Sequence, residues 1–369
     1  MVIKTNEIKE LCSKILAAVD SSELSILADK LQLYTKDDTL YLAVSNNKYF
    51  VKVKFILPGK ENFNATLKAS LFLKLISQTT SEIIDLSIAD SFMVVKGNGT
   101  YKLPLVYDND KLLELPEIVI NNKTSEFDIE TSILNSILVF NTKELNKGAV
   151  NKQVQMMYYV DEEGAITFTS GACVNKFTLP CPIKILFDQQ VVKLFKIFKG
   201  EKVKFAIGYD ALSEELVQTK VSFEDDTTTL TAILSSNDNL INSVPVTAIR
   251  NRAYKDYAYS ISINREELLQ AINRIMLFTT TGLTAYGKFT FGDEAVSIAD
   301  SRDANEEIIK YSSASNIVDP YEARLDLKDV KLTLENCTEQ NITMNFGDKA
   351  AFVISRGNIY NVIPEAIMQ

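Results

Sequence analysis

The chain has 369 residues, of which 46% are hydrophobic and 24% charged, and its formal net charge is −9. This composition is typical of a globular chain with two or three domains. The sequence contains no histidine, which excludes catalytic triads and metal sites built on that residue. An acidic chain is also not the default binder of nucleic acid, although net charge says nothing about how the charges are distributed.

No secretory signal or membrane span is expected. Charged residues interrupt residues 1–20, where a signal peptide would be apolar, and no apolar run approaches the ~18 residues of a membrane helix. The four cysteines (Cys12, Cys173, Cys181 and Cys337) form no C-x-x-C pair and are expected to be reduced thiols. We therefore predict a cytoplasmic protein that does not bind membranes.

The first segment is predicted to combine short strands with two helices. A strand at 2–4 precedes Asn6, which can cap a helix, and apolar residues follow at helical spacing. These apolar residues are Ile8, Leu11, Cys12, Ile15 and Val19. A second helix is expected at 66–76. Alternating patterns predict strands at 31–33, 40–44, 49–55, 83–88, 92–95 and 101–106, with a hairpin turn at Asp37 and Asp38.

The second and third segments repeat this order. In the second, a strand at 127–129 and Glu130 precede a helix at 133–140, and a further helix is expected at 188–198. In the third, Asn264 is expected to cap a helix at 265–278, and a weaker helix follows at 324–334. The strands predicted in these two segments are at 156–160, 165–169, 203–208, 217–223, 228–234, 259–263, 286–291, 295–299, 306–311, 342–346 and 350–354.

The sequence indicates an internal repeat, because it contains three similar strand-to-helix starts and three similar segment ends. The predicted caps Asn6, Glu130 and Asn264 lie 124 and 134 residues apart. Each segment also ends on a hydrophobic-proline pair, for which coincidence among the eight prolines is the alternative explanation. These pairs are Leu115-Pro116, Val244-Pro245 and Ile363-Pro364.

Each repeat has the length of an ordinary domain. We therefore predict an α+β chain of three similar domains at 1–122, 123–250 and 251–369. The connectors between them are expected near 108–124 and 237–256.

The motifs that would support catalysis are incomplete. The G-x-G at 97–99 lacks the third glycine of a dinucleotide loop, and the Gly-Lys pair at 59–60 lacks the rest of a phosphate-binding loop. Acidic pairs such as 162–163 lie in predicted turns, where solvation explains them, and no clustered ligands accompany Asp300. We therefore predict no catalytic residues, no metal and no cofactor.

Basic residues occur on the predicted helices of all three segments. Lys193, Lys196 and Lys199 follow at intervals of three, so they are expected to share a helix face. For any one helix a solvated surface is the simpler alternative, but the acidic residues concentrate in predicted turns instead. Helices with a basic face and an apolar back fit a surface that faces phosphates. The candidate phosphate-contacting residues are Lys9, Lys14, Lys68, Lys74, Lys193, Lys196, Lys199, Arg265, Arg274 and Lys328.

At three places the sequence resembles the bacterial replicative sliding clamp, the beta subunit of DNA polymerase III. Residues 263–272, which read INREELLQAI, resemble the opening of that family's third domain. Residues 301–308 (SRDANEEI) resemble its following hairpin and strand, and residues 361–364 (NVIP) resemble its C-terminal signature. The order and spacing of the segments extend the resemblance over the whole chain. It implies three similar domains, each with two helices packed on antiparallel sheets, in a ring-forming fold.

The resemblance also implies a function. Two copies would join head to tail as a homodimer and close a ring around double-stranded DNA, with helices inside and sheets outside. Such a ring binds DNA without sequence preference, tethers the DNA polymerase, depends on a clamp loader and has no catalytic activity of its own. An interaction scaffold that keeps the fold but forms no ring is the alternative. A carboxylate-dependent hydrolase is a third and less favoured reading.

Members of this family bind short partner peptides in a pocket between their second and third domains. The residues that match the two walls of that pocket are Thr169, Gly171 and Val174 on one side and Val362, Ile363 and Pro364 on the other. Core packing of a last strand is an equal alternative for Val362 and Ile363. The pocket is expected to persist as an apolar groove.

This chain also departs from the family at the pocket. Ser170, Ala172 and Cys173 replace the family's usual Asp, His and Arg, and the tail continues to Gln369 beyond the usual end. The resemblance therefore implies a divergent member, from a virus or an AT-rich bacterium, whose peptide preference is expected to differ.

Overall fold

The computed structural model describes residues 1–20, 25–57, 62–137, 157–168, 171–211, 217–234, 238–279, 285–315 and 317–366. The chain forms two compact units. Unit 1 comprises Met1–Asn135 and Gln190–Asn237, and unit 2 comprises Ser136–Gln189 and Asp238–Gln369. The chain is 21% helical and 47% strand, which confirms the predicted α+β class.

Unit 1 is built on an eight-stranded antiparallel sheet with the strand order β11-β16-β17-β18-β4-β3-β2-β5. A four-stranded sheet, β1-β6-β7-β8, and the short pair β10-β9 complete the unit. The strands of the large sheet are β2 (Lys30–Lys36), β3 (Thr39–Ser45), β4 (Tyr49–Ile56), β5 (Asn64–Lys68), β11 (Lys123–Glu130), β16 (Lys202–Ala211), β17 (Val217–Glu224) and β18 (Thr228–Ile233). Those of the small sheets are β1 (Val2–Lys4), β6 (Ile83–Ala89), β7 (Phe92–Lys96), β8 (Thr100–Pro104), β9 (Tyr107–Asp108) and β10 (Lys111–Leu112).

The hairpin between β2 and β3 shows how local sequence sets the register of the large sheet. Asp37 and Asp38 both have positive φ angles, 49° and 56°, as a two-residue type I′ turn requires. The turn places Leu33 opposite Leu42, and both side chains are fully buried. The predicted turn is therefore confirmed.

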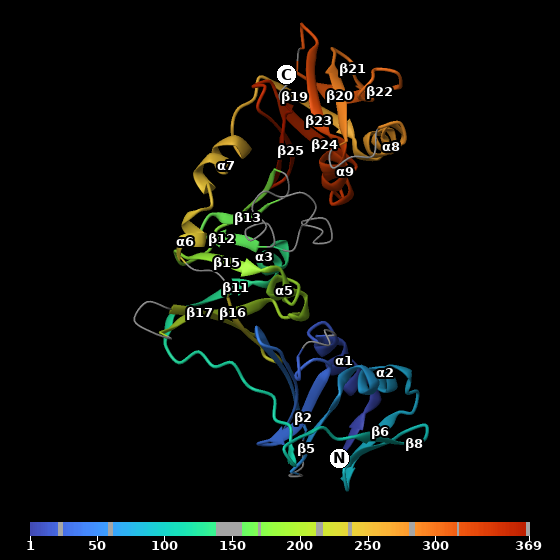
Figure 1. Ribbon diagram of the computed structural model, residues 1–369, viewed down its shortest axis with the longest axis vertical. Helices are drawn as coiled ribbons and strands as arrows, with labels where there is room; N and C mark the ends of the chain where they lie inside the picture. Colours follow the sequence, from blue (N-terminus) through green and yellow to red (C-terminus); the bar gives the residue numbers. More distant parts are fainter. Residues whose placement is uncertain are drawn as a thin grey trace. The chain divides into compact units, whose positions relative to one another are not determined.

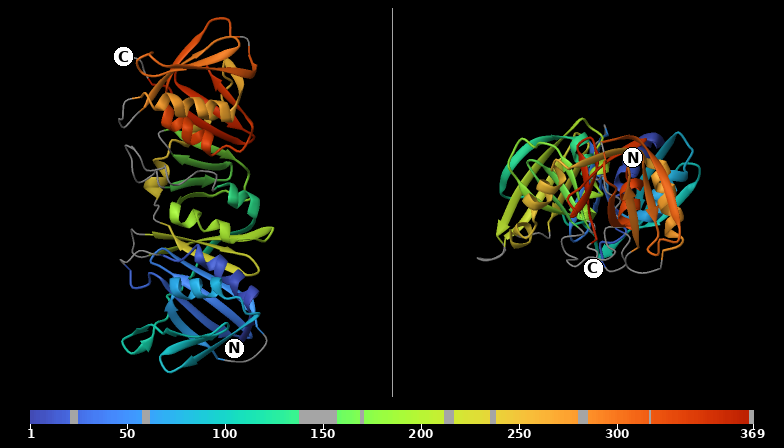
Figure 2. Two further views of the ribbon diagram at one scale, coloured as in Figure 1. Left: turned by 90° about the vertical axis from the view of Figure 1, so that its right-hand side faces the viewer. Right: turned by 90° about the horizontal axis from the view of Figure 1, so that it is seen from above.

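Helices α1 (Thr5–Leu16) and α2 (Ala69–Gln78) lie side by side in unit 1, and α1 packs on β3 and β4 (Figures 1 and 2). Ile8, Leu11, Cys12 and Ile15 of the predicted stripe are buried, whereas Val19 lies beyond the helix end. The predicted cap is wrong. The cap position is Lys4, two residues before Asn6, because β1 runs directly into the helix and the Thr5 N–H donates to the carbonyl of Glu82 at 2.9 Å.

The second helix of each segment begins later than predicted, and one of them is broken. α2 begins at Ala69, and α9 (Leu327–Glu335) begins three residues after the predicted start. In place of the helix at 188–198 there is one turn, α5 (Gln189–Val192), followed by a 3₁₀ turn, η1 (Phe195–Ile197). In each case the preceding residues extend a strand, because alternating apolar side chains such as Leu67 pair into the sheet.

Unit 2 is built on a twelve-stranded sheet with the order β15-β12-β13-β14-β26-β25-β24-β19-β22-β21-β20-β23. Its strands are β12 (Met157–Asp161), β13 (Gly164–Phe168), β14 (Ala172–Lys176), β15 (Lys184–Asp188), β19 (Tyr259–Asn264), β20 (Tyr286–Phe291), β21 (Ala295–Ala299), β22 (Glu306–Ala314), β23 (Tyr321–Asp326), β24 (Asn341–Phe346), β25 (Ala351–Arg356) and β26 (Ile359–Pro364). Its other helices are α6 (Asp238–Asn242), α7 (Val246–Ala253) and α8 (Arg265–Met276).

Helices α8 and α9 pack side by side over one of the two cores of unit 2 (Figures 1 and 2). Asn264 caps α8 as predicted, because its side chain accepts hydrogen bonds from the N–H groups of Glu266 and Glu267 at 2.9 and 3.1 Å. Beneath the helices the rings of Phe291 and Phe346 lie 4.2 Å apart, centroid to centroid. Burial of such rings is a large part of what holds the helices to the sheet.

The three predicted strand-to-helix starts are present. β1 runs into α1, β11 into α3 (Thr131–Ser136), and β19 into α8. The predicted continuation of α3 beyond residue 137 lies outside the described residues. The division into three domains stays a prediction, because residues 123–250 contribute to both compact units.

All four cysteines are free thiols, as predicted. Burial raises the pKa of both Cys12 and Cys173 to about 12. These two thiols therefore stay protonated at neutral pH and pack as small apolar side chains.

Candidate functional site

The basic residues predicted on the middle helix of the chain lie on a surface, but the helix differs from the expected one. Lys193, Lys196 and Lys199 are exposed, while Phe195 and Phe198 between them are fully buried. An interval of three suits a 3₁₀ turn, where side chains at i and i+3 eclipse each other. The broken helix therefore still presents three ammonium groups to solvent.

The other basic residues of unit 1 differ in their exposure and in their contacts. Lys74 on α2 is exposed, and Lys68 at the end of β5 is 66% exposed, 3.7 Å from Asp29. Lys14 is only 10% exposed and its ammonium donates to the Thr227 hydroxyl at 3.1 Å. Lys14 is therefore held within the unit, whereas Lys68 and Lys74 are available.

In unit 2 the two predicted arginines already have partners. Arg274 forms a bidentate pair with Glu307, with N–O distances of 2.6 and 2.9 Å. Hydrogen bonds from Arg274 lower the pKa of Glu307. Arg265 donates to Glu266 at 3.0 Å and to the carbonyl of Leu334 at 3.3 Å.

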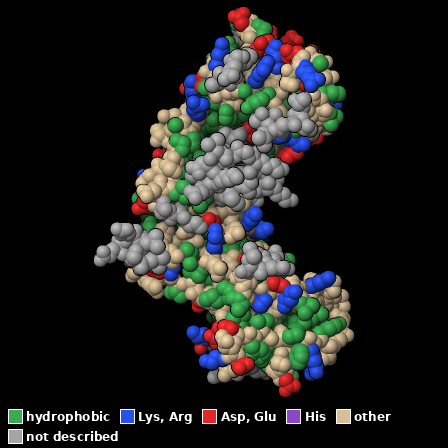
Figure 3. All heavy atoms as spheres, in the orientation of Figure 1, with side chains coloured by type: hydrophobic (Ala, Val, Ile, Leu, Met, Phe, Trp, Pro, Cys, Tyr) green, Lys and Arg blue, Asp and Glu red, His purple; other side chains and the backbone are tan. Residues whose placement is uncertain are grey.

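Lys9 is half-buried on α1, and Lys328 is exposed in the first turn of α9. In the face seen in Figure 3, basic side chains are interspersed with acidic ones instead of forming one continuous patch. A binding surface made of these residues would therefore consist of separate basic side chains. The lysines at 193, 196 and 199 are the most closely spaced of them.

The predicted peptide-pocket residues meet where β14 pairs with β26. The register sets Ala172 opposite Val362 and Val174 opposite Tyr360. A Cβ on Gly171 would lie 1.9 Å from the carbonyl oxygen of Val362 and 2.9 Å from the Pro364 ring. Only glycine fits at this position while the last strand stays paired. Thr169 lies outside the described residues.

Most of these pocket residues are core residues in the structure. Val174 and Val362 are 0% and 7% exposed and belong to one apolar cluster, and Ile363, 3% exposed, belongs to another. Pro364 is exposed and Gly171 is half-buried. The side chains of Val362 and Ile363 therefore lie in the core, which is the position that the core-packing alternative gives them.

An accessible groove lies beside the same apolar cluster, and the sequence reasoning missed its main wall. About 800 Å³ of space is lined by residues of α6 and α7 with Tyr159, Asp161 and Lys184 of the sheet. Ile241 and Val246 of this wall are half-buried against the cluster. This stretch was predicted as a connector, but Val246, Ile249, Arg250 and Ala253 follow at helical spacing after Pro245, which signals a helix.

A buried ion pair fixes α7 to the sheet. The guanidinium of Arg250 donates to both carboxylate oxygens of Asp161, at 2.8 and 2.5 Å, and to Glu163 at 2.9 Å. The side chains of Arg250 and Asp161 are 10% and 7% exposed. This pair positions one wall of the groove.

Neither a metal-binding cluster nor a membrane-spanning helix occurs among the described residues. No three acidic or cysteine side chains gather where they could hold a metal ion. No helix in this part of the chain is long and apolar enough to cross a membrane.

No protein-family model and no curated protein matches this sequence. Solved structures do match it over its full length. The DNA polymerase sliding clamp of Bacillus subtilis is 16% identical with a TM-score of 0.77, covering 100% of this chain and 99% of that one. The DNA polymerase III subunit beta of Pseudomonas aeruginosa is 11% identical with a TM-score of 0.78 and covers 100% of both chains. The Helicobacter pylori beta clamp bound to a DNA ligase peptide is 14% identical with a TM-score of 0.72, covering 100% and 99%. At these identities the likeness is one of fold.

Proposed function

We propose that this chain, which has the fold of the bacterial sliding clamps, is itself a DNA sliding clamp: a cytoplasmic homodimeric ring that encircles double-stranded DNA and tethers the DNA polymerase. The observation that carries the proposal is the match of the whole chain, 100% of its length, to clamp structures. A match of fold alone permits other functions, so the residues must supply the remaining support.

The exposed lysines support contact with DNA. Lys74 and the 193–199 group present exposed ammonium groups, and Lys68 is 66% exposed although it lies 3.7 Å from Asp29. A sliding ring needs affinity for phosphates without reading bases, and dispersed lysines supply this. The net charge of −9 is compatible with such a ring, because the remaining surface would then repel DNA.

Two open sheet edges support head-to-tail assembly. Among the residues of unit 1 that the structure describes, β8 pairs only with β7, and one isolated bridge follows it at Leu105. In unit 2, the first half of β22 pairs with β21 on one side, while its second half pairs with β19. Unpaired edges are places where another chain can add. We propose that β8 of one protomer joins β22 of its partner.

Exposed apolar side chains lie at the same end of unit 2. Ile308 on the open part of β22 is 69% exposed, and Leu277 and Phe278 just after α8 are 78% and 56% exposed. The Arg274–Glu307 pair fixes the end of α8 to β22, next to these residues. Such a patch is typical of an interface. On unit 1, Tyr101 of β8 is 40% exposed and could pack against it.

The groove beside α7 is proposed as the binding place of the polymerase and of the clamp loader. It is lined by half-buried apolar side chains and by Tyr159 and Tyr254, which suit short linear peptides. The Helicobacter pylori clamp that matches this chain was solved with a DNA ligase peptide. The predicted pocket residues Gly171 and Val174 position the strands under this groove. No catalytic activity is proposed.

Retention on DNA of different topology tests the proposal. The protein is loaded by its cognate loader onto nicked circular DNA, which is then linearised. We expect retention on the circle and loss from the free ends, because only a ring is lost by sliding off. Equal retention on both forms would mean ordinary surface binding. Absence from both, with loading shown to be competent, would favour a clamp-fold scaffold that does not encircle DNA.

Removing the densest lysine group should change the salt dependence of DNA binding. Replacing Lys193, Lys196 and Lys199 by alanine is expected to flatten the slope of log K against log salt by about one unit for each lost phosphate contact. A matched control replaces three exposed strand lysines, Lys96, Lys111 and Lys204, and should leave the slope unchanged. A slope unaffected by the first set would show that this surface does not meet DNA.

A further inference from the structure

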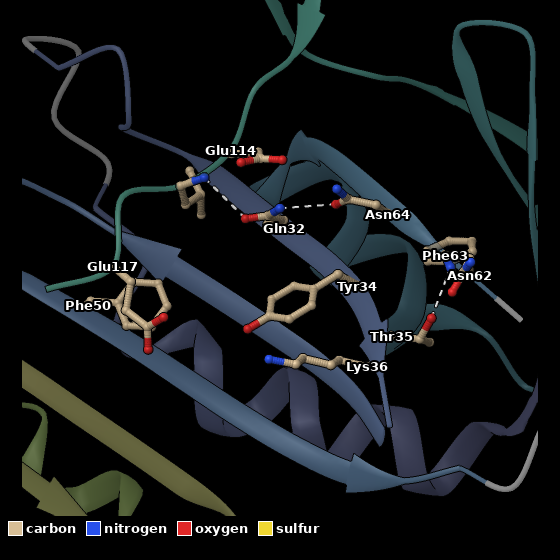
Figure 4. A pocket seen from close by; sticks show the side chains of 11 residues that line it. Gln32, Tyr34, Thr35, Lys36, Phe50, Asn62, Phe63, Asn64, Glu114 and Glu117 are labelled. Atoms are coloured by element: carbon tan, nitrogen blue, oxygen red, sulfur yellow. Dashed lines mark hydrogen bonds between the residues drawn. The ribbon is translucent and has the colours of Figure 1, made fainter. Parts of the chain in front are cut away.

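A second groove, of about 500 Å³, lies on unit 1, on the face of the eight-stranded sheet away from α1. Leu31 and Leu33 of β2 are buried on the helix side. Gln32 and Tyr34 alternate with them along the strand and therefore point to the other face. The chain at 114–117 crosses that face and supplies the second wall (Figure 4). This groove belongs to neither the basic surface nor the groove beside α7.

The groove is preorganised by hydrogen bonds within its walls. The Gln32 amide donates to the Asn64 side chain at 3.0 Å and accepts from the N–H of Leu115 at 3.1 Å. Ser45 and Thr66 also hold this stretch, by donating to the carbonyls of Pro116 at 2.9 Å and of Leu113 at 2.5 Å. Both walls therefore exist before any ligand arrives.

This surface already binds one cation of the chain itself. The ammonium of Lys52 lies 2.9 Å from Glu117 and over the rings of Tyr41 and Phe50, at 5.6 and 5.9 Å from their centroids. Tyr41 in turn stacks on Tyr34, with centroids 5.0 Å apart. Aromatic faces combined with a carboxylate stabilise a positive charge.

The other side of the stacked pair also combines an aromatic ring with a carboxylate. Tyr34 lies in the middle of the groove with Glu114 above it and Lys36 running beside it (Figure 4). Among the residues that the structure describes, the side chains of Glu114 and Lys36 are exposed and form no ion pair or hydrogen bond. Burial, with Glu117 and Tyr41 nearby, raises the pKa of Tyr34 to about 12, so its hydroxyl stays a neutral donor.

We propose that this groove binds a segment of a partner protein that carries an arginine close in sequence to an acidic residue. The guanidinium would stack on Tyr34 and pair with Glu114, and the acidic side chain would reach Lys36. Arginine is favoured over lysine because its planar group can stack and donate in two directions at once. The amides of Asn62 and Asn64, which also line the groove, are suited to the peptide backbone. The proposal goes beyond the clamp function, since it involves neither DNA nor the groove beside α7.

Ligand-observed NMR with a minimal probe tests this inference. The probe is the tripeptide Ac-Arg-Gly-Glu-NH2, titrated into the full-length protein, and its matched control contains citrulline, which keeps the shape of arginine without the charge. We expect saturable binding of the arginine peptide. The citrulline peptide, and the variants Glu114→Gln and Tyr34→Leu, should each weaken binding at least about fivefold, the effect of one charge-assisted contact. Glu82→Gln, which changes an exposed carboxylate elsewhere in unit 1, should have no effect.

Three results would overturn the inference. The first is the absence of saturable binding to the wild-type protein up to about 10 mM, a concentration that corresponds to a very weak affinity. The second is equal binding of the citrulline peptide, and the third is unchanged binding to the Glu114→Gln variant. Because the probe requires no DNA and no loader, any of these results leaves the clamp proposal unaffected.

Discussion

Replacing Leu277 and Phe278 by aspartate is expected to convert the protein from a dimer into a monomer. The two side chains are 78% and 56% exposed, so unit 2 does not need them for folding. In the proposed interface each would bury an apolar surface worth about 1.5–3 kcal/mol, and aspartate would have to lose its hydration there. The combined loss of about 4 kcal/mol corresponds to an approximately thousandfold weaker dimer.

Native mass spectrometry measures this directly. The wild-type protein should appear at twice the 41.3 kDa mass of one chain, and the double variant at 41.3 kDa. The matched control is Val318→Asp, which removes another apolar side chain of unit 2 that is 78% exposed, and it should remain dimeric. A monomeric wild type, or a dimeric double variant, would contradict the assignment of β22 and the end of α8 to the interface. The monomeric variant should also lose retention on circular DNA.

The starts of the helices were predictable where a strong local signal exists. Asn264 caps α8 through its own side chain, and this signal is visible in the sequence. At the N-terminus the cap was predicted at Asn6, but the Thr5 N–H is satisfied by the carbonyl of Glu82, and the Thr5 hydroxyl donates to the carbonyl of Ser81. Partners about 76 residues away in the chain leave no local pattern. The helix predicted at 66–76 is present, but its predicted start is wrong for a related reason, since pairing with β2 places residues 66–68 in a strand.

Some features of the candidate sites were also predictable from the sequence, and others were not. Exposure of Lys193, Lys196 and Lys199 was predictable, because their period of three separates them from buried aromatic residues whether the backbone is α or 3₁₀. The ion pair between Arg274 and Glu307 was not predictable, because Arg274 lies on α8 and Glu307 lies on β22, far along the chain. Val362 and Ile363 match a pocket motif, but strand pairing on both sides of β26 buries them.

The largest stability effect is expected from Arg250. Replacing it by methionine should lower the free energy of unfolding of unit 2 by about 3–5 kcal/mol, because Asp161 would remain as a buried carboxylate without its partner. Glu163, 68% exposed, would lose little. The matched control is Arg252→Met, an exposed arginine on the same helix, for which a change within about 0.5 kcal/mol is expected.

The measurement is urea unfolding followed by circular dichroism, with hydrogen exchange of the β12 amides to locate the effect in unit 2. The double variant Arg250→Met with Asp161→Leu should recover most of the loss, since replacing both charges leaves no unpaired group. No recovery would mean that Arg250 acts through packing and not through its charge.

The same variant separates the two halves of the proposed function. Loss of the ion pair frees α7, which is one wall of the peptide groove, so partner-peptide binding should weaken more than DNA binding. The lysines of unit 1 are unchanged, so the salt dependence of DNA binding should keep its wild-type slope. If peptide binding were unaffected while unit 2 was destabilised, the partner site would have to lie away from α7.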